Sequence, residues 1–294
     1  MERRQRADGG GQAREVPGGE ALPPLPRKER RKAAARKALG PQVVHEAIRQ
    51  EGEEELARPT AALAWSGLAA GLSMGFSLVG EGVLRAALPD VPWRPLVAKL
   101  GYSLGFLFVI LGRQQLFTEN TLTVILPAMA RRDGRTVLRV ARVWAVVLAA
   151  NVVGAFAFAW SLTLPGAFSE AQRQAFTDLG REMMEPPFWT TLVRGVYGGW
   201  LIALMVWLLP AARSARFFVV VVVTWLVGVG AFAHVVAGSI ETLHLVATGA
   251  LPFARYLGGF LLPAFLGNSV GGVAMVAAFA HAQVVAGAAR ADGR

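Results

Sequence analysis

The sequence predicts an all-α membrane protein with six transmembrane spans, arranged as two inverted three-span repeats. Two observations lead to this prediction: the composition is strongly apolar, and the apolar residues form long blocks between short charged connectors. Of the 294 residues, 54% are hydrophobic and 17% charged, with a mean hydropathy of +0.43, whereas soluble domains carry about 45–50% apolar and about 25% charged residues. The chain has no cysteine, which excludes thiol catalysis, cysteine-ligated metals and a disulfide scaffold.

Residues 1–58 differ from the rest of the chain. They hold 13 Lys/Arg and 10 Asp/Glu, and seven of the basic residues lie between Arg27 and Lys37. We expect a basic cytoplasmic tail, partly disordered and with short helices, whose charge is that of a solvated positive-inside segment. Contact of its basic residues with anionic lipid is the alternative. No apolar stretch suitable for a secretory signal occurs in it.

Six apolar blocks follow the tail. A straight span needs about 20 apolar residues, but the second and fifth blocks are longer and are interrupted by polar residues at 113–120 and 234–244. Irregular backbone at membrane depth is tolerated only where protein or a water-filled cavity covers it. The second and fifth helices are therefore predicted to be broken, with breaks that line a pathway. The blocks lie near 60–84, 96–130, 140–165, 188–210, 216–250 and 255–285.

The charged connectors predict the orientation. Five arginines lie between 131 and 142, whereas four acidic residues lie in the longest opposite connector, 166–187. By the positive-inside rule, both termini are cytoplasmic, and the membrane is expected to be the inner (cytoplasmic) one. Residues 59–286 then form the channel domain and 287–294 a cytoplasmic C-terminal tail. The net charge of +10 is explained by this topology, so no nucleic-acid partner is expected.

An internal repeat supports the inverted arrangement. Asn151-Val-Val-Gly154 is matched 117 residues later by Asn268-Ser-Val-Gly271. Thr118 in the first break precedes Asn151 by 33 residues, and His234 in the second precedes Asn268 by 34. Two three-span halves must insert in opposite senses, which predicts a site at the midplane where the breaks meet.

Four segments resemble the formate/nitrite transporter family: Tyr102–Phe106 with Leu116-Phe117-Thr118, Gly195–Met205, Phe232-Ala-His234, and Gly267–Gly272. The resemblance covers about residues 60–285. It implies an aquaporin-like architecture, a homopentamer in the lipid bilayer, and a pore in each protomer for small monovalent anions or weak acids such as formate and nitrite, with or without a proton. The chain departs from the family pattern at Gln115, Gly199, Ala233 and Gly238.

The resemblance also implies the pore residues. His234 and Thr118 are expected to face the centre of the path, Tyr102 and Phe106 to form its wall, and Val227 to stand where an aromatic gate residue is common. The remaining expected pore residues are Leu116, Phe117, Asn120 and Asn268.

Two roles are open for His234. With an ordinary pKa of about 6.5, it would donate a proton to a weak-acid anion, or else remain neutral and stabilise the break through a hydrogen bond. Thr118 would bind His234 or the anion through its hydroxyl, or cap the outgoing half-helix.

Charged residues in the two breaks need partners, because an unpaired charge at membrane depth costs about 2.5–3.5 kcal/mol on insertion scales. We expect Arg113 to pair with Glu119 or Glu241, with a direct role in selectivity as the alternative. Glu81 and Arg85 are expected to pair at the outer surface.

The sequence predicts a channel or secondary transporter for small monovalent anions, and not an enzyme. Two alternatives stay open: a pore for a small neutral solute, and a membrane scaffold or sensor that acts through the N-terminal tail. No metal-ligand spacing, phosphate loop or catalytic triad is evident, so no cofactor is expected.

Overall fold

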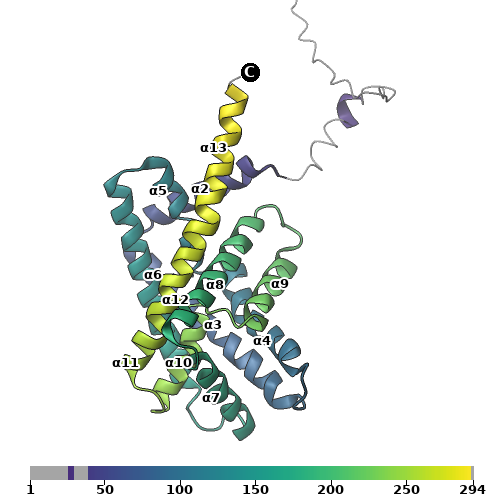
Figure 1. Ribbon diagram of the computed structural model, residues 1–294, viewed down its shortest axis with the longest axis vertical. Helices are drawn as coiled ribbons and strands as arrows, with labels where there is room; N and C mark the ends of the chain where they lie inside the picture. The colour runs from purple at the N-terminus through teal and green to yellow at the C-terminus, as the bar shows by residue number, and fades with distance from the viewer. Residues whose placement is uncertain (1–25, 30–38, 293–294) are drawn as a thin grey trace, which may run out of the picture. The chain divides into compact units, whose positions relative to one another are not determined.

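The computed structural model describes residues 26–29 and 39–292. The chain divides into a unit of residues 1–38 and a unit of residues 39–294, and the second unit is described below. Most of the basic cluster predicted between Arg27 and Lys37 lies outside the described residues. Within the described part of the second unit every regular element is a helix (Figure 1). In chain order they are α2 Pro41–Ala57, α3 Thr60–Ala87, α4 Arg94–Leu111, η1 Glu119–Thr121, α5 Ile125–Arg131, α6 Gly134–Ser161, α7 Glu170–Met184, α8 Phe188–Leu208, α9 Arg216–Val229, α10 Ala237–Ala247, α11 Phe253–Tyr256, η2 Leu257–Leu261, α12 Leu262–Gly272, η3 Val273–Ala278 and α13 Phe279–Asp292.

Among the residues that the structure describes, five helices are long and apolar enough to cross a membrane. One of them joins several elements, because Phe253–Val284 runs through α11, α12 and the start of α13 with two π-helical turns. The apolar helix α9 has only 14 residues, since the fifth apolar block is interrupted as the sequence predicts. The five helices are Thr60–Ala87, Arg94–Leu111, Gly134–Ser161, Phe188–Leu208 and Phe253–Val284.

The second break lies earlier in the chain than the sequence predicts. We expected it at 234–244, but α9 ends at Val229 and α10 begins at Ala237. The prediction was wrong for 237–244, because the polar side chains there form hydrogen bonds with the backbone of their own helix. The Ser239 hydroxyl donates to the carbonyl of Val235, and the Thr242 hydroxyl to that of Gly238, so polarity does not force the helix open.

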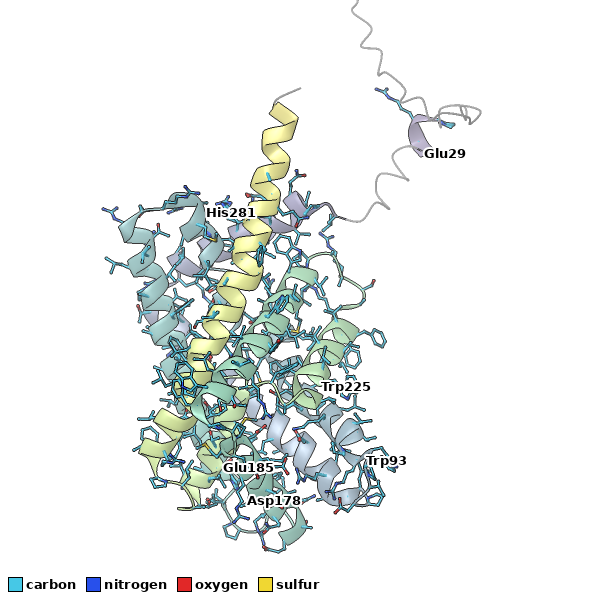
Figure 2. The ribbon with its side chains drawn as sticks, viewed as in Figure 1. Glu29, Trp93, Asp178, Glu185, Trp225 and His281 are labelled. Carbon is cyan, nitrogen blue, oxygen red and sulfur yellow. The ribbon has the colours of Figure 1, made fainter. Side chains whose placement is uncertain are left out.

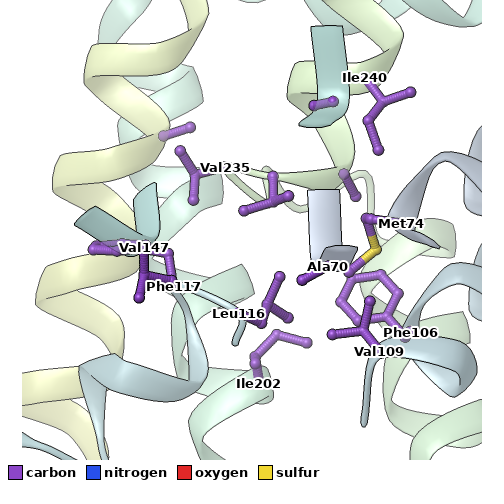
Figure 3. Close-up of a cluster of buried hydrophobic side chains, with 14 of the residues drawn as sticks. Ala70, Met74, Phe106, Val109, Leu116, Phe117, Val147, Ile202, Val235 and Ile240 are labelled. Carbon is purple, nitrogen blue, oxygen red and sulfur yellow. The ribbon is translucent and has the colours of Figure 1, made fainter. Parts of the chain in front are cut away.

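The first break covers the predicted residues 113–120 and extends further. Helix α4 ends at Leu111 and α5 begins at Ile125, with the single turn η1 between them. Figure 3 shows Leu116 and Phe117 of this break and Val235 of the second break within one cluster of buried apolar side chains. The central residues of both breaks, 115–118 and 233–236, are therefore buried inside the bundle.

Helix α7 lies in the connector that we expected only to be acidic. It begins with a capping box in which Ser169 accepts from the backbone of Gln172 and the Gln172 side chain accepts from the backbone of Ser169. Its buried residues Phe176 and Leu179 pack on the rest of the bundle. Figure 1 shows α7 and α11 at the end of the unit opposite to α2 and α5. We call these the α7 end and the α2 end.

Candidate functional site

The two breaks begin with the same backbone turn. Gly112 is the C-cap residue of α4, and Gly230 is the C-cap residue of α9. The next residue in each case is a non-glycine residue in the left-handed region, Arg113 with φ 51° and Ala231 with φ 49°. This conformation is uncommon for residues with a Cβ atom. At each break the backbone therefore leaves the helix in the same sharp turn and enters the interior of the bundle.

Asn151 of α6 holds the first break in place. Its amide nitrogen donates to the carbonyls of Gly67 and Gln115, both at 2.8 Å, and its oxygen accepts from the backbone of Phe117 at 2.9 Å. The side chain is fully buried. It therefore satisfies loop backbone groups that would otherwise be unpaired in an apolar interior.

Asn268 of α12 does the same for the second break. Its amide nitrogen donates to the carbonyls of Gly195 and Ala233, both at 2.8 Å, and its oxygen accepts from the backbone of Val235 at 2.8 Å. Gly67 of α3 and Gly195 of α8 play the same part in the two halves, because the carbonyl of each accepts a hydrogen bond from the asparagine of its half. Each break is thus fixed to one helix pair, α3–α6 or α8–α12.

Glycines let these helix pairs cross closely. A Cβ atom on Gly71 would lie 2.2 Å from the carbonyl oxygen of Asn151, and one on Gly199 would lie 2.3 Å from that of Asn268. Gly199, where the sequence departs from the family pattern, is therefore required by the approach of α12.

His234 and Thr118 meet where the two breaks approach each other. Nε2 of His234 lies 2.8 Å from Oγ1 of Thr118, and both residues are fully buried. The backbone N–H of Ala237 donates to Nδ1 of His234 at 3.1 Å. Because Nδ1 accepts, the proton of the neutral ring lies on Nε2, which donates to the Thr118 hydroxyl. That geometry favours the neutral, hydrogen-bonding role for His234 in this conformation.

Phe106 covers the histidine on the α4 side. The rings of Phe106 and His234 meet edge to face with centroids 4.8 Å apart, and Tyr102 packs on Phe106 at 5.4 Å. Phe106 is fully buried. The centre therefore combines one hydroxyl and one imidazole with an aromatic wall.

A cavity of about 330 Å³ opens toward this centre from the α2 end. We call it the α2-side cavity. It reaches Leu116 and Asn120 of the first break. Its charged lining comprises Glu51, Glu54, Glu55, Arg58, Arg113, Glu119 and Arg216.

Helix α2 supplies the ion-pair partner of Arg113. A guanidinium nitrogen of Arg113 lies 2.8 Å from Oε1 of Glu51. The expected pairing of Arg113 with Glu119 or Glu241 is wrong, because Arg113 points to the surface with 76% of its side chain exposed and Glu241 lies at the other end. Burial raises the pKa of the Glu55 carboxyl above its ordinary value, and the adjacent Arg58 guanidinium opposes that rise.

A smaller cavity of about 60 Å³ lies toward the α7 end, and we call it the α7-side cavity. Tyr102 and Val227 line it, together with Lys99, Arg194 and Glu241. Nζ of Lys99 lies 2.5 Å from Oε1 of the buried Glu81.

The predicted surface pair of Glu81 and Arg85 is therefore wrong. Arg85 instead binds Glu182 of α7 through two hydrogen bonds, of 2.5 and 2.9 Å. Helix α7, which we did not predict, supplies this partner.

The structure places most of the predicted pore residues beside the two cavities or between the two breaks. Leu116 and Asn120 line the α2-side cavity, Tyr102 and Val227 line the α7-side cavity, and Thr118, Phe106 and His234 are buried near where the two breaks meet. Phe117 turns toward Trp144 and Phe265, and Asn268 braces the backbone of the second break. Neither of these two residues lines the α2-side or the α7-side cavity.

Sequence reasoning missed Lys99. It is the only lysine after residue 37, and it precedes Tyr102 and Phe106 by three and seven positions, which places all three on one face of α4. The signal in the sequence was a single lysine on the same apolar face as the expected pore wall.

Comparisons with known proteins agree with this arrangement. Residues 42–282 match the family model described as Formate/nitrite transporter. The inner membrane protein YfdC of Escherichia coli is 43% identical over 241 residues, covering 82% of this chain and 78% of that protein. The formate channel FocA of Haemophilus influenzae is 24% identical over 241 residues, covering 73% of this chain and 84% of that protein. A solved pentameric formate channel with formate bound shares the fold, with a TM-score of 0.64 at 21% identity over 79% of this chain and 96% of that chain.

Proposed function

We propose the following function for this chain, which belongs to the formate/nitrite transporter family. Each protomer passes small monovalent anions of the formate and nitrite type, as weak acids, through a pore between the α2-side and α7-side cavities. The observation that supports this most directly is the contact between Thr118 and His234, which joins the two breaks at 2.8 Å. The chain acts as a channel or secondary transporter.

The tautomer of His234 supports a solute site at the centre. The Thr118 oxygen accepts from Nε2 of His234, so the Thr118 hydroxyl hydrogen is available to an oxygen of the passing solute. A bare ion in an apolar constriction is heavily penalised. A hydroxyl donor polarised by an imidazole N–H lowers that penalty without placing a full charge in the pore.

The six-span, two-repeat arrangement is also part of this proposal. The matching turns at Arg113 and Ala231, and the matching hydrogen bonds of Asn151 and Asn268, support two equivalent halves. Because each half has three spans, the halves are inverted in the membrane. We place residues 1–58, the α2 end and residues 287–294 in the cytoplasm and residues 59–286 in the inner membrane.

Labelling of single cysteines tests this topology cleanly, because the chain has none of its own. Ala171→Cys at the α7 end should react with an impermeant reagent from outside, and Ser214→Cys only after permeabilisation. The reverse pattern would contradict the orientation.

A homopentamer in the lipid bilayer completes the proposal. Many large apolar side chains are exposed on a single protomer, including Trp65, Leu138 and Trp189 at 72–73%. Such an apolar surface requires lipid or neighbouring subunits, and the structurally similar formate channel is pentameric.

Flux through proteoliposomes tests the function. The purified protein should carry at least one of formate, nitrite, acetate, lactate and hydrosulfide faster than protein-free vesicles. Transport of glycerol alone would contradict the anion pore and support the alternative, a pore for a small neutral solute. No flux of any solute, combined with a phenotype on deletion of residues 1–38, would favour the scaffold or sensor.

A further inference from the structure

Glu241 is a buried carboxyl group whose hydrogen bonding is incomplete. The residue is 1% exposed, it lines the α7-side cavity, and its Oε2 has no hydrogen-bond partner among the described residues. An ionised carboxylate needs donors at both oxygens when it leaves water. An oxygen that carries a proton instead offers a donor to whatever enters the cavity.

Several other charged and titratable groups surround Glu241. Lys99 is already paired with Glu81, and Arg85 with Glu182. Arg194 lines the cavity and adds a positive charge. Tyr102 faces it from α4, Tyr256 follows α10 and binds Ser239, and His244 lies one turn beyond Glu241 with its Nδ1 unpartnered among the described residues. The cavity is thus lined by Lys99 and Arg194 and also by Glu182, which is paired with Arg85. An ionised Glu241 would add a second negative charge there and repel the anion that the two cations attract.

The centre of the pore has no vacant basic atom for a proton. Nδ1 of His234 accepts from Ala237 and Nε2 donates to Thr118. A second proton on the ring would point at the Ala237 N–H, so it would break that hydrogen bond. A proton that travels with the weak acid therefore has to join it before it reaches Phe106 and His234.

We propose that Glu241 exchanges a proton with the weak acid in the α7-side cavity, beside Lys99 and Arg194. This inference rests on the proposed function. The anion binds near the two cations, and the O–H bond of the Glu241 carboxylic acid breaks as a new O–H bond forms on the anion. The products are a neutral acid, which passes the apolar centre, and a Glu241 carboxylate. Water at the α7 end returns a proton to Glu241, and the same steps in reverse serve export.

Formate uptake with a pH-sensitive dye inside proteoliposomes tests the proposal. In the wild type, inward proton movement should accompany formate uptake. Glu241→Gln removes the exchangeable proton, so it should lower uptake by about 10²-fold, the lower end of general acid–base effects, and abolish the accompanying proton movement. Glu241→Asp keeps a carboxyl group and should restore proton movement in part. Melting temperature and oligomeric state in detergent show whether each variant folds.

Asp178→Asn is the matched control, because Asp178 is a carboxylate at the same end that binds Gln174 and does not line the cavity. It should leave uptake and proton movement unchanged. A folded Glu241→Gln variant with the wild-type ratio of protons to formate would overturn the proposal, and so would loss of proton movement in His244→Asn but not in Glu241→Gln. Absence of any anion flux in the wild type would instead overturn the proposed function itself.

Discussion

Nε2 of His234 lies 2.8 Å from Oγ1 of Thr118 and so connects two breaks that are 116 residues apart in the chain. This hydrogen bond determines which atoms at the centre remain free to bind a solute. The imidazole has both nitrogens engaged, whereas the Thr118 hydroxyl still has its own hydrogen to donate. Changes at these two positions should therefore have different effects on transport.

Thr118→Val preserves the shape of the side chain and removes the hydroxyl. We expect a folded protein whose formate flux is reduced severalfold, because a lost hydrogen bond to the passing solute is worth about 0.5–1.5 kcal/mol. Thr118→Ser keeps the hydroxyl and should retain most of the flux. Equal rates for Thr118→Val and the wild type in vesicles would show that the solute does not bind this hydroxyl.

His234→Asn removes the imidazole N–H that orients Thr118. Flux should fall at every pH, but the rise of weak-acid uptake at low pH should remain, because the exchanging proton lies on Glu241 in our proposal. The measurement is initial uptake of formate from about pH 5 to about pH 8, across the ordinary range of histidine titration. A variant that loses only the low-pH rise would place the proton on His234 instead.

Asn151 and Asn268 should be equivalent for stability. Replacing either by Leu leaves one N–H and two carbonyl groups without their partner, and each unsatisfied buried group costs about 1–3 kcal/mol. We expect both variants to melt at lower temperature in detergent and to yield less protein. Asn→Asp at either site should be worse than Leu, because a buried carboxylate would carry a negative charge against the two carbonyl oxygens in an apolar interior. A large effect at only one asparagine would contradict the equivalence of the halves.

These asparagines also show how far the sequence predicts the site. Their spacing from Thr118 and His234 predicts that the two breaks meet, and the 2.8 Å contact confirms it. The sequence does not predict which charges pair. The ion pairs of Glu81 with Lys99 and of Arg113 with Glu51 form between separate helices. The distance between their side chains depends on how those helices pack, which no local sequence pattern encodes. Helix α7 was missed because its amphipathic stretch lies within an acidic connector.

Gly199→Ala tests the close crossing of α8 and α12. The added Cβ atom would lie 2.3 Å from the carbonyl oxygen of Asn268, so the helices must separate and the second break must shift. Overpacking of this kind typically costs about 1–3 kcal/mol. Gly258→Ala is the control, because a Cβ atom there meets nothing within 4 Å. Equal melting temperatures for the two variants would show that α8 and α12 can move apart without a loss of stability.

The docking of α2 should depend on pH through His45. This residue is buried on α2, and its Nε2 lies 3.2 Å from Nδ1 of His281 on α13, which Figure 2 shows toward the α2 end, opposite to Asp178 and Glu185. Burial and the nearby His281 lower the pKa of His45 below 6.5.

Because its pKa is lowered in the folded protein, His45 binds a proton more readily once α2 is released. Its contribution to docking is therefore present above about pH 6.5 and is lost as the pH falls toward the lowered value. Hydrogen exchange, expressed as protection factors, should show weaker protection of α2 at about pH 5.5 than at about pH 7.5. His45→Leu keeps an apolar contact without a titrating group, so the difference should disappear. If wild-type protection is the same at both pH values, the pairing of His45 with His281 does not control how α2 is held, and the other contacts of α2, among them the ion pairs of Glu51 with Arg113 and of Glu53 with Arg131, must do so.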